Sequence, residues 1–190
     1  MTNSKPAPLR QLILVTGPAR SGKSEWAESR AAGSRKQVIY VATGLVDAAD
    51  LEWMRRLEKH RNRRQVDWET LEVPIELSAV VRSASASDCL LIDSLGTWTA
   101  NLLEQEATVW GQMQQDLLAG LKSTAADVIL VGEETGWGVV PAYPAGRLFR
   151  DRLGTLVRHI GAIADSVYLV TGGYALDLSA LGTPLPPAKN

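Results

Sequence analysis

Five short apolar runs, rich in β-branched residues, recur along the chain and are separated by longer segments. Apolar and polar residues do not alternate within these runs, which is typical of strands buried on both faces of a parallel sheet. The pattern predicts strands at residues 11–16, 37–42, 89–93, 127–132 and 166–171, and residues 66–73 fit a further strand.

The segments between the runs show the three- and four-residue spacing of amphipathic helices. Strands that alternate with such helices predict an α/β fold in which right-handed crossovers join parallel strands. We expect one domain over residues 11–178, between flexible tails at 1–10 and 179–190. The helices are expected at residues 23–32, 48–59, 75–82, 95–122 (broken near Thr108) and 147–164.

A glycine-rich loop lies between the first expected strand and the first expected helix. Residues Gly17–Ser24, GPARSGKS, fit the pattern G-x-x-x-x-G-K-[ST]. The glycines let backbone N–H groups point at phosphate oxygens, and the positive end of the following helix adds to the attraction. Lys23 would reach the outer phosphates, and the Ser24 hydroxyl would bind Mg²⁺. The alternative is a glycine-rich turn without a ligand, but the strand–loop–helix context favours a nucleoside triphosphate.

Such a loop works with a carboxylate that organises the metal ion at the end of another buried strand. Asp93 ends the run CLLID and is our candidate for that metal ligand. The alternative is that Asp93 caps the helix that begins next to it, because Asp is favoured at N-caps. Glu133 and Glu134 follow another expected strand, and their spacing does not separate metal, substrate and solvent roles.

A basic segment surrounds one of the two histidines. Six of the ten residues at 55–64 are lysine or arginine, and His60 lies among them. A segment of this kind is often a solvated helix face. A nucleic-acid-binding patch is the next alternative, but the balanced net charge of the chain and the absence of interleaved aromatic residues argue against it. Neighbouring cations favour the neutral, nucleophilic imidazole, and arginines bind triphosphates and offset developing charge. The segment therefore suits attack by His60 on an α-phosphate.

The composition is that of an ordinary globular chain, 45% hydrophobic and 22% charged, with a formal net charge of −1. No overall field attracts nucleic acid or an acidic membrane surface, and no apolar run approaches the roughly 20 residues of a membrane span. The opening residues lack the apolar core of a secretory signal. The single cysteine, Cys89, lies in an apolar run, which favours a reduced core residue in a cytoplasmic protein.

The phosphate loop and the basic segment belong to an ordered series of motifs. The others are YVATG, W-x-T-x-E ending at Glu72, LLIDSLGTWTANLL, and the patterns E-x-G-x-G-x-V-P at 134–141 and R-x-F-R-D-x-x-G at 147–154. From about Leu12 to Leu178, this series resembles the bifunctional adenosylcobinamide kinase / adenosylcobinamide-phosphate guanylyltransferase family of vitamin B12 synthesis. The family typically reads Asn-Glu-Val-Gly where this chain has Glu133-Glu134-Thr135-Gly136.

The resemblance implies a P-loop enzyme, similar in fold to RecA-like domains, that carries out two reactions. It would phosphorylate adenosylcobinamide with ATP or GTP and then transfer GMP from GTP onto that phosphate, through a guanylylated His60. It also implies a homotrimer, and it gives Lys23 and His60 catalytic roles, with Mg²⁺ on Ser24 and Asp93. The implied nucleotide-binding residues are Gly17, Pro18, Ala19, Arg20, Ser21, Gly22, Lys23, Ser24, Ala42, Thr43, Gly44, Arg61, Asn62, Arg63, Arg64, Glu72 and Asp93.

Two other functions stay open on the residues alone. One is a different P-loop kinase of small molecules, in which His60 and its arginines form only a phosphate-binding lid. The other is a nucleotide-dependent switch module that hydrolyses its nucleotide slowly. The choice of guanine over adenine rests on the resemblance.

Overall fold

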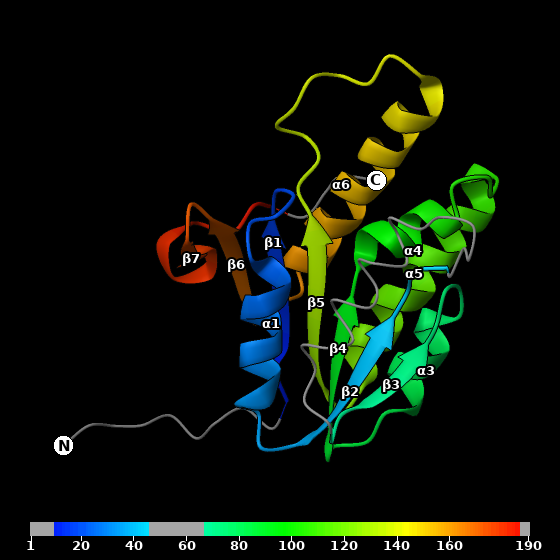
Figure 1. Cartoon of the computed structure of the whole chain (residues 1–190). Coiled ribbons are helices and arrows are strands. Elements are labelled where there is room, and N and C mark those ends of the chain that lie inside the picture. The colour runs from blue at the N-terminus through cyan, green and yellow to red at the C-terminus, as the bar shows by residue number, and fades with distance from the viewer. Residues whose placement is uncertain (1–9, 46–66, 187–190) are drawn as a thin grey trace.

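A mostly parallel β-sheet with helices on both faces forms the centre of the molecule (Figure 1). The structure is a computed structural model and describes residues 10–45 and 67–186. Within these residues the sheet has seven strands in the order β3-β2-β4-β5-β1-β6-β7, and only β7 runs antiparallel to its neighbour. The predicted α/β class is therefore confirmed. The strands are β1 (Leu12–Gly17), β2 (Gln37–Ala42), β3 (Glu69–Glu72), β4 (Asp88–Asp93), β5 (Asp127–Glu133), β6 (Ser166–Thr171) and β7 (Tyr174–Asp177).

The five strands predicted from apolar runs all form, with ends within one residue of the predicted ends. β3 occupies the centre of the further stretch at 66–73. The sequence analysis missed β7, a short strand with mostly exposed residues. Its signal was the pair Gly172 and Gly173, whose positive φ values of 58° and 83° make the tight turn between β6 and β7.

Apart from α7, which the sequence did not predict, the described helices lie within a few residues of the predicted ones. The expected break near Thr108 is confirmed, because α4 and α5 are separate helices. α6 begins three residues earlier than predicted, since Pro144 stands in the first turn, where its missing N–H costs nothing. The helix expected at 48–59 lies outside the described residues. The helices are α1 (Lys23–Ala32), α3 (Leu77–Ser83), α4 (Leu95–Asn101), α5 (Ala107–Ser123), α6 (Pro144–Gly161) and α7 (Leu178–Leu181).

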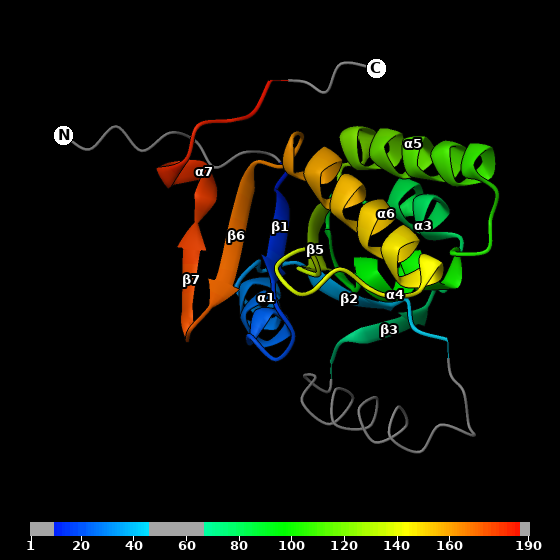
Figure 2. The same ribbon diagram turned by 90° about the horizontal axis from the view of Figure 1, so that it is seen from above.

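Helices lie on both sides of the sheet, as the view from above shows (Figure 2), and each side has its own apolar core. α3, α4, α5 and α6 cover one face and bury large side chains such as Trp98 and Trp110. α1 covers the other face with small residues, Ala27 and Ala31. Cys89 lies in this second core, as predicted, and burial raises the pKa of its thiol to about 11. In the described part of the chain, no helix combines the length and apolar character required to cross a bilayer.

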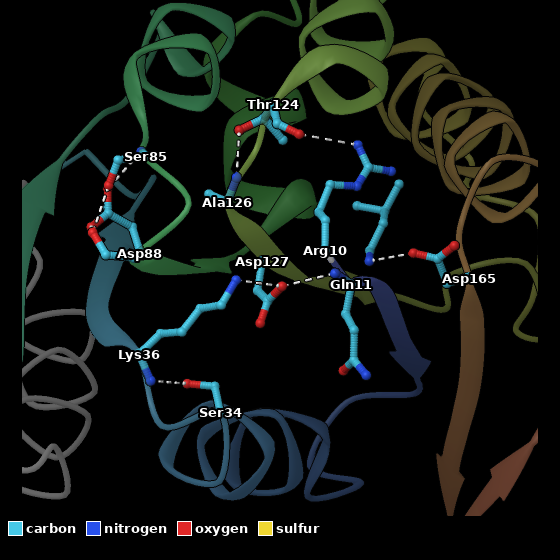
Figure 3. A network of polar contacts seen from close by, with 12 residues as sticks. Arg10, Gln11, Ser34, Lys36, Ser85, Asp88, Thr124, Ala126, Asp127 and Asp165 are labelled. Carbon is cyan, nitrogen blue, oxygen red and sulfur yellow. Dashed lines mark hydrogen bonds and ion pairs between the residues drawn. The ribbon is translucent and has the colours of Figure 1, made fainter. Parts of the chain in front are cut away.

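Hydrogen bonds and an ion pair link neighbouring elements at the amino-terminal edge of the sheet (Figure 3). The Asp127 carboxylate accepts a hydrogen bond from the Gln11 N–H at 2.8 Å and pairs with the Lys36 ammonium at 2.9 Å. The Asp165 carboxylate accepts a hydrogen bond from the Leu12 N–H at 2.7 Å. These contacts fix the start of β1, and through β1 they position the loop at its other end.

Arg152 of α6 is a buried charge that ties this helix to the end of α4. Its guanidinium donates to three carbonyl oxygens, those of Leu102 at 2.9 Å, Leu103 at 3.0 Å and Gln105 at 2.7 Å. It also lies 5.2 Å from the ring centre of Trp110. The planar five-donor head of arginine suits this arrangement, because one side chain satisfies three carbonyl groups that have few alternatives.

We expect Arg152→Met to lower the free energy of unfolding by about 2–4 kcal/mol, because three carbonyl groups lose a charged donor. Urea unfolding followed by tryptophan fluorescence measures the change. The control is Arg158→Met on the exposed face of the same helix, which should change stability by less than about 0.5 kcal/mol. Equal effects of the two substitutions would contradict the role given to Arg152.

Candidate functional site

The predicted site residues that the structure describes gather at the carboxyl-terminal edge of the sheet. Ala42 at the end of β2 pairs in register with Glu72 of β3 on one side and Asp93 of β4 on the other. Gly17 at the end of β1 pairs with Glu133 of β5, which lies between β1 and β4. Ligands of open α/β sheets bind at this edge, so the fold brings the predicted groups to one place.

The phosphate loop joins β1 to α1 at this edge. Gly17 has no room for a side chain, because an added Cβ would clash with the Val170 carbonyl oxygen of β6. Gly22 has a φ of 91°, which favours glycine, and α1 begins at the next residue. Arg20 also has a positive φ, 59°. The loop therefore turns tightly and presents the N-terminus of a ten-residue helix to the edge of the sheet.

Two side chains of the loop suit a bound anion. The Lys23 side chain is largely buried, and its ammonium donates to the Pro18 carbonyl oxygen at 3.3 Å, the long end of hydrogen bonding. The Ser21 hydroxyl is buried and has no hydrogen-bond partner among the described residues. A buried hydroxyl without a partner costs free energy, so a ligand oxygen in the loop would remove that cost.

Asp93 does not cap the neighbouring helix, so the capping alternative is wrong. The N-cap of α4 is Ser94, whose hydroxyl accepts a hydrogen bond from the Thr97 N–H. The Asp93 carboxylate instead accepts a hydrogen bond from the Tyr40 hydroxyl at 2.9 Å. This contact orients the carboxylate at the end of β4, on the edge where the phosphate loop also lies.

The backbone at Ser94 is held by several elements. Thr43, just after β2, is fully buried, and its hydroxyl accepts a hydrogen bond from the Ser94 N–H at 2.9 Å and donates to the Ser94 carbonyl oxygen at 2.6 Å. Asn101 donates to the Thr43 carbonyl oxygen at 2.7 Å. The structure thus engages the side chain of Thr43, a predicted nucleotide contact, in fixing the turn that carries Asp93.

Glu133 is one of the two glutamates for which the sequence did not separate metal, substrate and solvent roles. One carboxylate oxygen accepts a hydrogen bond from the Ser94 hydroxyl, and the other accepts one from the Gly96 N–H at 2.8 Å. Burial raises the pKa of Glu133 most strongly; the Ser94 hydrogen bond and the Lys23 charge lower it, and the Asp93 charge raises it further. Glu133 thus lies in an electrostatic group with Lys23 and Asp93.

Glu134, the adjacent candidate, has different surroundings. Its backbone N–H donates to the Gly17 carbonyl oxygen at 2.9 Å, but its carboxylate accepts a hydrogen bond from the Gly136 N–H of its own loop. The structure thereby separates the two glutamates that spacing alone did not. Sequence reasoning gave no role to Ser94, Gly96 or Tyr40. For Ser94 a signal was present in the capping pattern S-x-x-T that starts there.

The remaining predicted residues fall into two groups. Ala42 and Gly44 flank Thr43 at the end of β2, and Glu72 is exposed at the end of β3. His60 and the four residues Arg61, Asn62, Arg63 and Arg64 lie outside the described residues. Their predicted roles therefore stay predictions.

The described residues contain no cluster of three or more histidine, cysteine, aspartate or glutamate side chains that would form a metal cage. Mg²⁺ bound with nucleotides does not require one, because it is usually held by one or two protein oxygens together with phosphates and water. Asp93 and Ser24 supply oxygen donors of this kind on the same edge of the sheet. The residues present therefore fit Mg²⁺ in company with a nucleotide.

A cavity of about 360 Å³ lies at the opposite, amino-terminal edge. The acidic side chain in its lining, Asp127, is already paired with Lys36 and with the Gln11 N–H. Because it lies at the far end of the strands from the phosphate loop, we do not assign the predicted chemistry to it.

Comparisons with known proteins match most of the chain. The family model described as cobinamide kinase / cobinamide phosphate guanyltransferase matches residues 13–178. A Pseudomonas aeruginosa protein named bifunctional adenosylcobalamin biosynthesis protein CobP is 41% identical over 180 residues, which cover 93% of this chain and 100% of the relative. The Salmonella typhimurium protein named bifunctional adenosylcobalamin biosynthesis protein CobU is 33% identical over 182 residues, 88% of this chain and 99% of the relative.

Solved structures with low sequence identity share the fold. A Pyrococcus horikoshii OT3 protein superposes with a TM-score of 0.56 at 7% identity, over 95% of this chain and 94% of that chain. An ATP synthase subunit of Nanoarchaeum equitans gives a TM-score of 0.52 at 12% identity, over 91% of this chain and 54% of that chain. These likenesses concern the fold alone.

We expect Gly96→Ala to destabilise the protein by about 1–3 kcal/mol, the usual range for overpacking a buried position. An added Cβ would lie 2.6 Å from the Glu133 carboxyl carbon and would push this side chain off the start of α4. Chemical unfolding measures the change. The control is Gly111→Ala in α5, where an added Cβ meets nothing within 4 Å and helix propensity predicts a gain of up to about 1 kcal/mol. A neutral Gly96→Ala variant would refute the close approach.

Proposed function

This chain belongs to the cobinamide kinase / cobinamide phosphate guanyltransferase family, and we propose that it catalyses both reactions in that name. The first transfers the γ-phosphoryl group of ATP or GTP to a hydroxyl of the cobinamide. The second transfers GMP from GTP to the resulting phosphate and releases pyrophosphate. The observation that carries the proposal is the phosphate loop of β1 and α1, on the same sheet edge as Asp93, in a chain that the family model matches nearly throughout.

The loop at residues 17–24 would bind the nucleotide phosphates through its backbone N–H groups and the N-terminus of α1. The Lys23 ammonium would exchange its long contact with the Pro18 carbonyl oxygen for the outer phosphates. Phosphoryl transfer needs chiefly positioning and the stabilisation of charge on the transferred group, and these residues supply both.

Mg²⁺ would be held by the Ser24 hydroxyl and the Asp93 carboxylate. When bound, it would offset the negative charge of the phosphate groups. Tyr40 and Ser94 support this role, because one donates to the Asp93 carboxylate and the other fixes the start of the following helix.

We propose His60 as the nucleophile of the second reaction. A neutral ring nitrogen attacks the α-phosphorus of GTP, the bond to the bridging oxygen breaks, and pyrophosphate leaves. A phosphate oxygen of the corrinoid then attacks the same phosphorus and releases the histidine. Arginines of the basic segment at 55–64 would offset the developing charge. This part of the proposal is supported by the sequence and the family resemblance, since the segment lies outside the described residues.

We further propose a corrinoid acceptor, a homotrimeric assembly and a cytoplasmic location. The names of the relatives, bifunctional adenosylcobalamin biosynthesis proteins, support the corrinoid acceptor. The trimer follows from the family resemblance. The free, buried Cys89 suits a reducing compartment.

A plain small-molecule kinase and a nucleotide-dependent switch are the competing functions. The kinase would transfer the γ-phosphoryl group with no covalent intermediate on the enzyme. The switch would change its affinity for a partner with the state of the nucleotide, and its slow hydrolysis would not depend on His60. A covalent guanylyl-enzyme therefore separates our proposal from both.

We expect the purified protein, incubated with Mg²⁺ and GTP labelled at the α-phosphate, to acquire protein-bound label that is acid-labile and alkali-stable, as a phosphoramidate is. His60→Ala should abolish this label while GTP still binds. The matched control is His159→Ala, which removes the only other histidine of the chain and should leave labelling unchanged.

Adding cobinamide phosphate should remove the label from the wild-type protein and form a cobinamide–GDP product. A wild-type protein that binds GTP but never becomes labelled would contradict the guanylyltransferase proposal. Persistent labelling of the His60→Ala variant would show that a residue other than His60 is the nucleophile.

A further inference from the structure

Glu133 links the strand beside the phosphate loop to the turn that carries Asp93. It ends β5, and Gly17 of the loop pairs with it in register. Its two carboxylate oxygens accept hydrogen bonds from the Ser94 hydroxyl and, at 2.8 Å, from the Gly96 N–H. Gly96 has no Cβ at the point where this carboxylate packs against the helix. The side chain is thus fixed by two donors and by a close packing contact.

The charges around Glu133 are those of the proposed nucleotide site. Lys23 of α1 attracts the carboxylate and Asp93 of β4 repels it. Partial burial strengthens these interactions relative to water, because the local dielectric constant is lower. The negative charge of Glu133 therefore changes the binding free energy of a charged ligand at the proposed nucleotide site.

The effect of the Glu133 charge on nucleotide binding depends on whether a divalent cation is bound. Without a cation, the Glu133 carboxylate repels the phosphates of a nucleotide and competes with them for the Lys23 ammonium. With a divalent cation between the phosphates and Asp93, the same carboxylate attracts the cation. The Glu133 charge thus weakens the binding of free nucleotide more than that of the nucleotide–cation complex. The gain in nucleotide affinity on adding the cation is therefore larger with this charge than without it.

We propose that Glu133 is a positioning residue that couples divalent-cation binding to nucleotide binding, through its charge beside Lys23 and Asp93 and its hold on the Ser94–Gly96 turn. The inference rests on the proposed nucleotide site. It gives Glu133 a role distinct from that of Glu134, whose carboxylate accepts a hydrogen bond from its own loop.

Glu133→Gln tests the charge with little change in shape. The amide oxygen would accept from the Gly96 N–H, and the amide nitrogen would donate to the Ser94 hydroxyl oxygen, so both pairs stay in contact while the second hydrogen bond reverses its direction. Calorimetric titration gives the GTP dissociation constant in excess Mg²⁺ and in EDTA, and the ratio of the two measures the coupling. We expect Glu133→Gln to bind GTP more tightly than wild type in EDTA and to lower this ratio at least fivefold, the lower end of typical couplings.

Two matched variants complete the test. Glu133→Asp keeps the charge on a shorter side chain and should retain the wild-type ratio within about threefold, against the at least fivefold loss in Glu133→Gln. Glu134→Gln removes the adjacent charge and should lower the ratio less than Glu133→Gln does. Thermal unfolding of each variant establishes that it is folded before its affinity is compared.

An unchanged ratio in folded Glu133→Gln would overturn the inference, as would an equal loss in Glu134→Gln. Failure of the proposed function has a different outcome, since wild-type protein would then bind no GTP with or without Mg²⁺, or would bind it and never become labelled. Because the ratio is measured by binding, it does not require the corrinoid or turnover.

Discussion

The pairing of β5 between β1 and β4 is the constraint on which the candidate site depends. Adjacent strands lie about 4.8 Å apart, so one intervening strand places the end of β4 roughly 10 Å from the end of β1. The intervening strand ends in Glu133, so this residue lies in the sheet edge between the phosphate loop and Asp93.

The turn after Asp93 is rigid because several elements hold it through different atoms. Thr43 bonds to its backbone from β2, Glu133 bonds to it from β5, and Thr97 completes the capping box from α4. The hydroxyl groups of Thr43, Ser94 and Thr97 each donate one hydrogen bond and accept another, so these groups find their partners around the turn itself. Such a fixed arrangement lowers the cost of positioning groups around a bound phosphate, which is where phosphoryl transfer gains most of its rate.

The central strands could be predicted because burial on both faces leaves their composition little freedom, and the loop pattern predicted which edge carries the site. Other features depend on information that a sequence does not display. Successive residues of a strand point to opposite faces, so only one of Glu133 and Glu134 can face Ser94, and which one depends on where β5 ends. Asp and Ser are both good N-caps, and the backbone decided between Asp93 and Ser94. β7 has exposed residues and no apolar run, so only its glycine turn indicated it.

The net charge of the described site residues bears on the role proposed for the basic segment. Glu133 interacts electrostatically with both Lys23 and Asp93. Two carboxylates and one ammonium are net negative together, so these three groups alone would repel a triphosphate. The N-terminus of α1 and a divalent cation offset part of this repulsion. The six lysines and arginines at 55–64 are the largest concentration of positive charge in a chain whose formal net charge is only −1. In the proposed mechanism, the charge of this segment and that of the cation together would offset the repulsion of the phosphates. Positive charge of this kind suits both proposed reactions, because each breaks a phosphorus–oxygen bond and moves negative charge onto the leaving group.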